Sequence, residues 1–293
     1  MKVIVTGASG YIGSHVCRAL AEYGHEVHGL DLNIHGEHND VEQYCHRFWK
    51  QDIMDKFLHG WADACVHLAG LSLVGPSMLY PTQYYQKNVM GTKNVVESIR
   101  TPHVLFAGTS SAFEMASPYA RSKVCAEDVI KEKAEGYTIF RFFNVSGTDG
   151  VNRQLGEPTH LIRVAAEHAV GKRDKIEIYG TDYNTRDGTC IRDYIHVVDL
   201  ADAIVNAINS GPTNTPYECL GSNVGYSVRE VIKTMQEVTG KKLNIVESER
   251  RAGDAVSSVV DELSKHVKLN KTIEDMCYDQ FKLELGRNLH NYN

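Results

Sequence analysis

Tyr119 and Lys123 stand four residues apart, a spacing that puts a phenol and an ammonium one turn apart on the same face of a helix. A tyrosine with a pKa near ~10 is a poor base at neutral pH, and lowering that pKa to about 7 takes roughly 4 kcal/mol of added stabilisation of the phenolate. A neighbouring lysine ammonium supplies stabilisation of that kind. The pair therefore fits a general base, although an exposed pair on a surface helix would show the same spacing.

Three hydroxyl side chains, Thr109, Ser110 and Ser111, follow the apolar run 103–107. In a parallel sheet the functional site lies at the carboxyl ends of the strands, so this cluster is expected beside Tyr119. One hydroxyl there can bridge a substrate alcohol and the phenolate. Loop hydroxyls are also ordinary turn formers, and only their position favours a functional role.

A glycine-rich turn, residues 7–13, lies between a predicted strand and a predicted helix at the start of the chain. Gly7 permits a tight turn, Gly10 lets the backbone approach a pyrophosphate, and Gly13 allows close packing of helix on strand. The helix N-terminus then presents free N–H groups and a partial positive charge to the phosphates. This context predicts a dinucleotide site rather than a merely structural turn.

Asp31 closes the second predicted strand, 18 residues after Gly13. A carboxylate at this position accepts hydrogen bonds from an adenosine ribose and repels a 2′-phosphate. We therefore expect the cofactor to be NAD rather than NADP.

The elements that must position these residues alternate between apolar strands and helices, which predicts an α/β fold with a Rossmann-type, doubly wound parallel sheet. The predicted strands of this part are 2–6, 26–31, 64–68, 103–107 and 137–142, and the helices are 12–23, 83–100 and 118–134. After it, a smaller, mixed α/β substrate-binding part is expected, with helices 159–170, 199–210 and 228–239 and strands 176–179, 217–220 and 244–246. The predicted domains are 1–145 and 146–293, interleaved, with parts of 190–222 returning to the first.

Composition excludes several classes of function. A net charge of −6 argues against nucleic acid or an anionic membrane surface as the main partner. The seven cysteines are dispersed without a C-x-x-C pair, which favours free thiols in a reducing compartment. No apolar run approaches the roughly 20 residues of a membrane span and no signal peptide is evident, so a cytoplasmic protein is expected. No metal site is expected from the histidines that gather early in the chain, which are His25, His28, His35, His38 and His46.

Several motifs resemble the extended short-chain dehydrogenase/reductase family. They are the turn 7–13, Asp52-Ile53, His67-Leu68-Ala69-Gly70, Asn88, the segment 119–123 and Arg141-Phe142-Phe143-Asn144. The longer stretch 179–197 is more specific, and it is similar to the signature of the UDP-glucose 4-epimerase family. The resemblance extends from Met1 to about Asp261, and the last thirty residues match loosely.

The resemblance implies a role for each matching residue. Tyr119 would be the catalytic base, Lys123 would lower its pKa and hold the nicotinamide ribose, and Thr109 would bind the sugar hydroxyl. The cofactor residues would be Gly7, Gly10, Tyr11, Ile12, Gly13, Asp31, Asp52, Ile53, Leu68, Ala69, Gly70, Asn88, Tyr119, Lys123 and Phe143. The UDP-sugar would be held by Thr109, Asn144, His160, Leu161, Tyr179, Arg192, Arg251, Asp254 and Ser258. Independently of the family, two arginines suit a diphosphate because each presents paired donors.

The chain departs from the family's pattern at several places. One of them follows the hydroxyl cluster, where Ala112-Phe113-Glu114 replaces a usual Val-Tyr-Gly. Ser72 stands where a lysine is usual, and Thr159-His160 replaces an Asn-Asn pair near the uracil. Only five residues separate Phe113 from Tyr119, so the rim of the site is shortened. Ser258 occupies the place of a large gatekeeper residue beside the C2 substituent of the sugar.

The activity expected from the resemblance is NAD-dependent 4-epimerisation of UDP-Glc and UDP-Gal. UDP-GlcNAc and UDP-GalNAc are also expected substrates, because the small side chain of Ser258 would leave room for the N-acetyl group. A UDP-glucuronate epimerase or decarboxylase and a sugar 4,6-dehydratase are the alternatives within the family. A dehydratase commonly has an Asp-Glu pair where this chain has Ser110-Ser111. A cofactor-sensing binding protein is the alternative from another class. A homodimer is expected, since the family pairs the helices that match 83–100 and 118–134.

Overall fold

The chain folds into two compact units in a computed structural model that describes residues 1–32, 39–55, 60–251 and 254–290. The first unit comprises Met1–Phe142, Ala201–Cys219 and Ser264–His266. The second comprises Phe143–Leu200, Leu220–Leu263 and Val267–Asn293. The chain thus crosses between the units more than once, and each is described by itself below.

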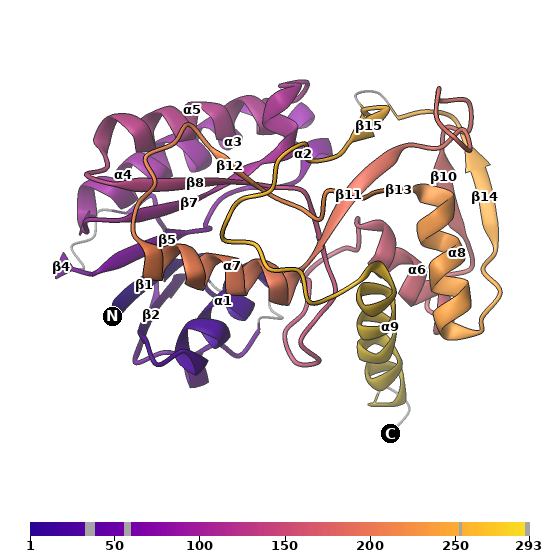
Figure 1. The fold of residues 1–293 in the computed structure, drawn as a ribbon, viewed down its shortest axis with the longest axis horizontal. Coiled ribbons are helices and arrows are strands. Elements are labelled where there is room, and N and C mark those ends of the chain that lie inside the picture. The colour runs from indigo at the N-terminus through magenta and orange to yellow at the C-terminus, as the bar shows by residue number, and fades with distance from the viewer. Residues whose placement is uncertain (33–38, 56–59, 252–253, 291–293) are drawn as a thin grey trace. The chain divides into compact units, whose positions relative to one another are not determined.

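A seven-stranded sheet forms the first unit, in the order β12-β8-β7-β5-β1-β2-β3. The pairings among the six strands from β8 to β3 are all parallel. Figure 1 shows α3, α4 and α5 along one face of this sheet and α1 along the other. This confirms the predicted α/β class and the doubly wound parallel sheet. The strands are β1 (Lys2–Thr6), β2 (Glu26–Asp31), β3 (Arg47–Lys50), β5 (Ala64–His67), β7 (Val104–Thr109), β8 (Tyr137–Phe142) and β12 (Glu218–Leu220).

The helices of the first unit bury one face against this sheet. Helix α5 packs on β7, and Ala126 and Ile130 join Phe106 in a buried cluster. Burial of such side chains is the main stabilising contribution. The bounds are α1 (Tyr11–Glu22), α2 (Val74–Leu79), α3 (Pro81–Tyr85), η2 (Gln86–Met90), α4 (Gly91–Ser98) and α5 (Pro118–Lys133). Two short strands, β4 (Gly60–Trp61) and β6 (Ile99–Arg100), pair with each other.

One predicted element is wrong in its form. The helix expected over 83–100 is broken into α3, a π-helical turn at η2, and α4, and its last two residues form the strand β6. The π turn carries Asn88, whose side chain bonds to neighbouring segments, and π turns are often found at functional sites. Ile99 is extended, with φ −107° and ψ 114°, because it pairs with β4 instead of continuing the helix.

The second unit is built on three helices that share one buried cluster, α6 (Leu161–Ala169), α8 (Val228–Thr239) and α9 (Ile273–His290). Helix α8 begins at a capping box formed by Ser227 and Glu230 and ends at Gly240, which is left-handed with φ 65°. Sequence patterns did not predict α9, because charged residues such as Glu274 and Lys282 interrupt its apolar spacing. Helix α7 (Val197–Ser210) belongs to both units.

The strands of the second unit form two small sheets. Strand β10 (Ile176–Tyr179) pairs with β14 (Ile245–Ser248). Strand β11 (Ile191–His196) pairs with β9 (Asn144–Ser146), β13 (Gly225–Ser227) and β15 (Ser257–Ser258). Strand β11 lies near the end of the signature stretch 179–197. Two residues of the predicted sugar site lie on strands paired with it, Asn144 on β9 and Ser258 on β15.

Within the described residues, no helix is both long and apolar enough to cross a membrane. No group of three His, Cys, Asp or Glu side chains that could hold a metal ion is found there either. Of the histidines that gather early in the chain, His35 and His38 lie outside the described residues. All seven cysteines lie among the described residues, as thiols.

Candidate active site

The glycine turn after β1 is as tight as the sequence predicted. Gly7 has φ 71°, and its N–H donates to Leu30 O over 2.8 Å. A Cβ placed on Gly13 would lie 2.0 Å from the carbonyl oxygen of Gly7. No other residue fits there without moving the backbone, so α1 starts directly against the turn.

The N-terminus of α1 is open to an anion, since no side chain among the described residues caps it. The Asp31 carboxylate lies close by and accepts a hydrogen bond from the Ser9 N–H over 3.0 Å. Asn39, which sequence reasoning missed, donates its amide to the carbonyls of Ser9 and Gly10 over 3.4 and 3.3 Å. A tight turn before a helix N-terminus without a side-chain cap among the described residues, with a carboxylate at the end of β2, fits a dinucleotide with an unmodified ribose.

Asp52 and Ile53 lie on a loop after β3. The Asp52 carboxylate accepts from the Met54 N–H and pairs with Lys87. Burial opposes ionisation of Asp52, but these partners outweigh it and hold its pKa below its ordinary value. Ile53 is buried and packs so closely on Gly91 that a Cβ there would lie 2.5 Å from Ile53 Cδ1.

The loop after β5 carries Leu68, Ala69 and Gly70, and Asn88 holds its far end. Asn88 Oδ1 accepts from the Leu71 N–H over 2.8 Å, and its amide donates to Leu71 O over 3.1 Å. Asn88 Nδ2 also donates to Ser122 Oγ on α5 over 2.9 Å. A side chain on Gly70, at φ 158°, would collide with the Asn88 amide.

Thr109 is the last residue of β7, and Tyr119 and Lys123 lie one turn apart in the first turns of α5. Burial raises the pKa of Tyr119, and a side-chain hydrogen bond with Thr109 opposes that rise. Burial lowers the pKa of Lys123 to about 8. The Lys123 ammonium lies over the ring of Phe106, 4.2 Å from its centre. Burial is thus the larger effect on the pKa of Tyr119, and it disfavours the phenolate.

A buried ion pair continues this helix face by one turn. Glu127 is fully buried, and Arg141 Nε and Nη2 donate to its two oxygens over 3.1 and 2.8 Å. The Glu127 charge also raises the pKa of Lys123, against the larger effect of burial. Arg141 lies over the rings of Phe113 and Tyr217, with its guanidinium carbon 4.8 and 3.9 Å from their centres. The spacing Tyr-x-x-x-Lys-x-x-x-Glu could have revealed in the sequence that Glu127 shares the helix face of Tyr119 and Lys123. No sequence pattern indicates that its partner is Arg141 on β8.

Apart from Thr109, the residues predicted to bind the nucleotide sugar lie in the second unit, and several of them lie on β11 and the strands paired with it. Arg192 and Ser258 are direct partners in the β11–β15 pairing. Asn144 pairs with Tyr194 and donates its amide to Asp193 O over 2.9 Å. His160 is exposed at the cap of α6, and Leu161 is the first residue of that helix. Phe143, predicted to line the cofactor, is the first residue of this unit and donates its N–H to Leu220 O.

A second group lies at the end of β10. The Arg251 guanidinium lies over Tyr179, with its carbon 4.6 Å from the ring centre, and Nε donates to Asp254 over 2.9 Å. Arg251 thus contacts both of the other predicted residues, Tyr179 and Asp254.

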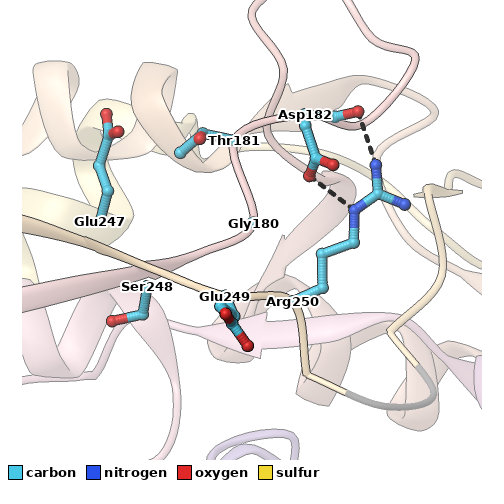
Figure 2. Close-up of a pocket in the computed structure, with 7 residues that line it drawn as sticks. All are labelled: Gly180, Thr181, Asp182, Glu247, Ser248, Glu249 and Arg250. Carbon is cyan, nitrogen blue, oxygen red and sulfur yellow. Dashed lines mark hydrogen bonds and ion pairs between the residues drawn. The ribbon is translucent and has the colours of Figure 1, made fainter.

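An open pocket of about 480 Å³ lies beside this group (Figure 2). Arg250 reaches across it to Asp182, donating to Oδ1 over 2.7 Å and to the carbonyl oxygen over 2.6 Å. None of the residues that line it is a predicted site residue. The lining residues are Gly180, Thr181, Asp182, Glu247, Ser248, Glu249 and Arg250.

The doubly wound sheet, the glycine turn and the Tyr119–Lys123 pair define a dehydrogenase-type, NAD-dependent fold. The family model described as the NAD dependent epimerase/dehydratase family matches residues 3–219. The chain belongs to this family.

Individual relatives agree with this assignment. The chain is 30% identical to a UDP-glucose 4-epimerase of Bacillus subtilis (strain 168), over 100% of this chain and 99% of the relative. It is similar to the structure of a UDP-glucose 4-epimerase from Stenotrophomonas maltophila with bound NAD and formylated UDP-arabinopyranose, with TM-score 0.88, 28% identity and 100% of both chains covered. It is also similar to the UDP-Glc/GlcNAc 4-epimerase of Campylobacter jejuni, with TM-score 0.79, 31% identity and 97% and 98% of the two chains covered.

The alignment with the Bacillus relative spans 337 positions, whereas this chain has 293 residues. The chain therefore lacks segments that the relative has. The short connection between Phe113 and Tyr119 is consistent with one such deletion.

Proposed function

We propose that the protein is a UDP-hexose 4-epimerase that interconverts UDP-Glc and UDP-Gal, and UDP-GlcNAc and UDP-GalNAc. The single observation that carries the proposal is the side-chain hydrogen bond between Thr109 and Tyr119, with Lys123 one helix turn further on, in a chain related over its full length to UDP-glucose 4-epimerases. The protein would be an isomerase in cytoplasmic carbohydrate metabolism, and its seven free cysteines are consistent with a reducing compartment.

The protein's own groups orient the sugar and move its proton. Tyr119 takes the proton of the sugar 4-hydroxyl, Thr109 holds that hydroxyl against the phenol, and Lys123 stabilises the phenolate. Bound NAD would supply the hydride chemistry at C4 and the additional positive charge near Tyr119. The residues of the glycine turn, with Asp31, Asp52 and Asn88, would hold it. The first unit would thus be the NAD-binding domain.

The second unit would bind the nucleotide sugar. Arg192 and Arg251 would hold the diphosphate, Arg251 with its guanidinium already oriented by Tyr179 and Asp254. Asn144, His160 and Leu161 would contact the remainder of the nucleotide sugar. A 4,6-dehydratase is less well supported, because Ser110 and Ser111 occupy the turn where that reaction commonly uses carboxylates.

The assignment is tested by incubating the purified protein, with NAD, separately with UDP-Glc, UDP-GlcNAc and UDP-GlcA, and resolving the products by NMR. We expect UDP-Gal and UDP-GalNAc from the first two. Loss of water or of carbon dioxide would indicate a dehydratase or a decarboxylase instead. Retained NAD with no product from any of the three would favour a binding protein.

Ser258→Tyr should discriminate between the two sugar classes. The β11–β15 pairing puts Ser258 beside Arg192, where a larger side chain would meet an N-acetyl group. Overpacking of typically ~1–3 kcal/mol corresponds to a loss of about 5- to 150-fold in kcat/KM for UDP-GlcNAc. UDP-Gal turnover should be spared. Ser257→Tyr is the matched control, because adjacent strand residues point to opposite faces. An equal loss of turnover with both sugar classes in Ser258→Tyr would show that Ser258 does not select between them.

A homodimer should be seen in solution. Large apolar side chains are exposed along the segment from α2 to η2, and patches of this kind mark interfaces. The exposed residues are Leu73, Val74, Met78, Leu79, Tyr80, Tyr85 and Met90. Light scattering at micromolar concentration should give twice the 32.7 kDa of one chain. Met90→Glu should weaken the dimer, whereas Tyr23→Glu, at another exposed aromatic, should not. A wild-type mass of one chain would rule the dimer out.

A further inference from the structure

His67, the last residue of β5, is completely buried and bonded at both ring nitrogens. Nδ1 lies 2.7 Å from Thr6 Oγ1 at the end of β1, and Nε2 lies 2.9 Å from Thr92 Oγ1 on α4. The ring therefore joins three elements of the first unit at the end of the sheet where the cofactor turn begins. The roles proposed for Tyr119 and the cofactor loops do not explain why a histidine is buried and hydrogen-bonded at this position.

The neighbours decide which ring nitrogen carries the proton. Thr92 Oγ1 lies 2.6 Å from the Asn88 carbonyl oxygen, which can only accept, so the single hydroxyl proton of Thr92 goes there. Thr92 Oγ1 then accepts from His67, which must carry its proton on Nε2. Nδ1 is left as an acceptor for the Thr6 hydroxyl, and Thr6 Oγ1 in turn accepts from the Ala69 N–H over 3.3 Å.

The same arrangement keeps the ring neutral. In a doubly protonated imidazole Nδ1 would itself be a donor, and the Thr6 hydroxyl would lose the acceptor of its proton. Burial and, to a smaller extent, the charge of Lys123 lower the pKa of His67 to about 3. The ring packs on Phe106, 5.6 Å between centres, and Phe106 is also the ring under the Lys123 ammonium.

The hydrogen bonds continue from Thr92 to the helix that carries Tyr119. Asn88, whose carbonyl receives the Thr92 proton, uses its side chain to hold Leu71 and Ser122. Ser122 Oγ then donates to Tyr119 O over 2.8 Å. An unbroken series of bonds thus links Thr6, next to the glycine turn, with the backbone of the proposed base. Its members come from β1, β5, η2, α4 and α5.

We propose that His67, fixed as the Nε2–H tautomer, is a positioning residue that aligns the cofactor loop after β5 with the Tyr119 helix. Its side chain contacts neither the sugar nor the proton that is transferred. It acts through Ala69 on one side and through Thr92 and Asn88 on the other. The activity part of the test below rests on the proposed epimerase function, whereas the spectroscopic part does not.

The tautomer is tested on the wild-type protein with NAD bound, by long-range ¹H–¹⁵N NMR of ¹⁵N-histidine-labelled protein, with His67→Gln used to assign the signals. We expect a neutral Nε2–H ring whose signals do not change between about pH 5 and about 8. A Nδ1–H ring, or titration near the ordinary pKa of ~6.5, would overturn the proposal.

The positioning role is tested at Thr92, where Thr92→Val removes the acceptor for His67 and the donor to Asn88 while keeping the shape. Misplacement by a fraction of an ångström to an ångström should lower kcat by about 10- to 100-fold, with KM for the UDP-sugar within about threefold of wild type. Thr92→Ser keeps the hydroxyl and should recover kcat to within about threefold. Wild-type kcat in Thr92→Val, or an equal loss in Thr92→Ser, would contradict the proposal.

A second buried pair provides the matched control. His103 Nε2 lies 2.9 Å from Thr138 Oγ1 in the same unit, and neither residue contacts the cofactor loop or α5 in these bonds. Thr138→Val should lower the melting temperature about as much as Thr92→Val and leave kcat unchanged. Equal loss of kcat in both would show a general effect of stability. If the wild type lacks epimerase activity, the proposed function fails, and the NMR result still decides the tautomer.

Discussion

Tyr119→Phe should reduce epimerase turnover by about 10²–10⁴-fold, the range typical for removal of a general acid–base group. The substitution removes only the phenol oxygen, and the ring keeps its edge contact with Tyr84, 6.4 Å between centres. The glycine turn, Asp31 and Asn88 are untouched, so NAD should remain bound. Turnover and NAD content per chain are both measured on the purified variant.

Tyr84→Phe is the control for this prediction. Its hydroxyl donates to Leu73 O over 2.6 Å and has no proposed part in proton transfer. This variant should lose some stability and keep turnover within about threefold of wild type. Turnover of Tyr119→Phe near that of the wild type would exclude Tyr119 as the base, whatever the fate of the cofactor.

Glu127→Gln should lower the free energy of unfolding by about 3–5 kcal/mol, because it leaves the Arg141 charge buried without its counter-charge. The Gln amide also turns an N–H group toward a guanidinium that presents only donors. Both partners are nearly inaccessible, with side-chain exposures of 10% for Arg141 and 0% for Glu127, so water cannot take the place of the lost carboxylate. Urea unfolding followed by circular dichroism measures the change.

The double variant Glu127→Gln, Arg141→Met separates loss of the pair from loss of packing. Removing both charges of a buried pair is often close to neutral, so the double variant should regain most of the stability that the single variant loses. A single variant within about 0.5 kcal/mol of the wild type would show that the pair contributes nothing to stability.

Local sequence patterns identified the residues that are proposed to bind the cofactor or to transfer the proton. The glycine turn is a single strand-turn-helix unit, and Tyr119 and Lys123 are neighbours on one helix turn, so their relation depends only on residues a few positions apart. Strand–helix alternation likewise predicted the parallel sheet that the structure has. These features could be predicted because helix period and turn geometry are properties of a short segment.

Contacts between distant segments were decided by the tertiary structure. The sequence alone determined the glycine turn, Asp31 at the end of a strand and the helical spacing of Tyr119 and Lys123, together with the family that they indicate. The tertiary structure decided that His67 bonds Thr6 and Thr92, that Arg141 meets Glu127, that Ser258 lies beside Arg192, and that helix 83–100 breaks at Asn88. Each of these depends on strand order, register or the packing of a helix on a sheet. These long-range contacts are selected by the burial of apolar side chains over the whole core. The spacing of residues within one segment carries no information about them.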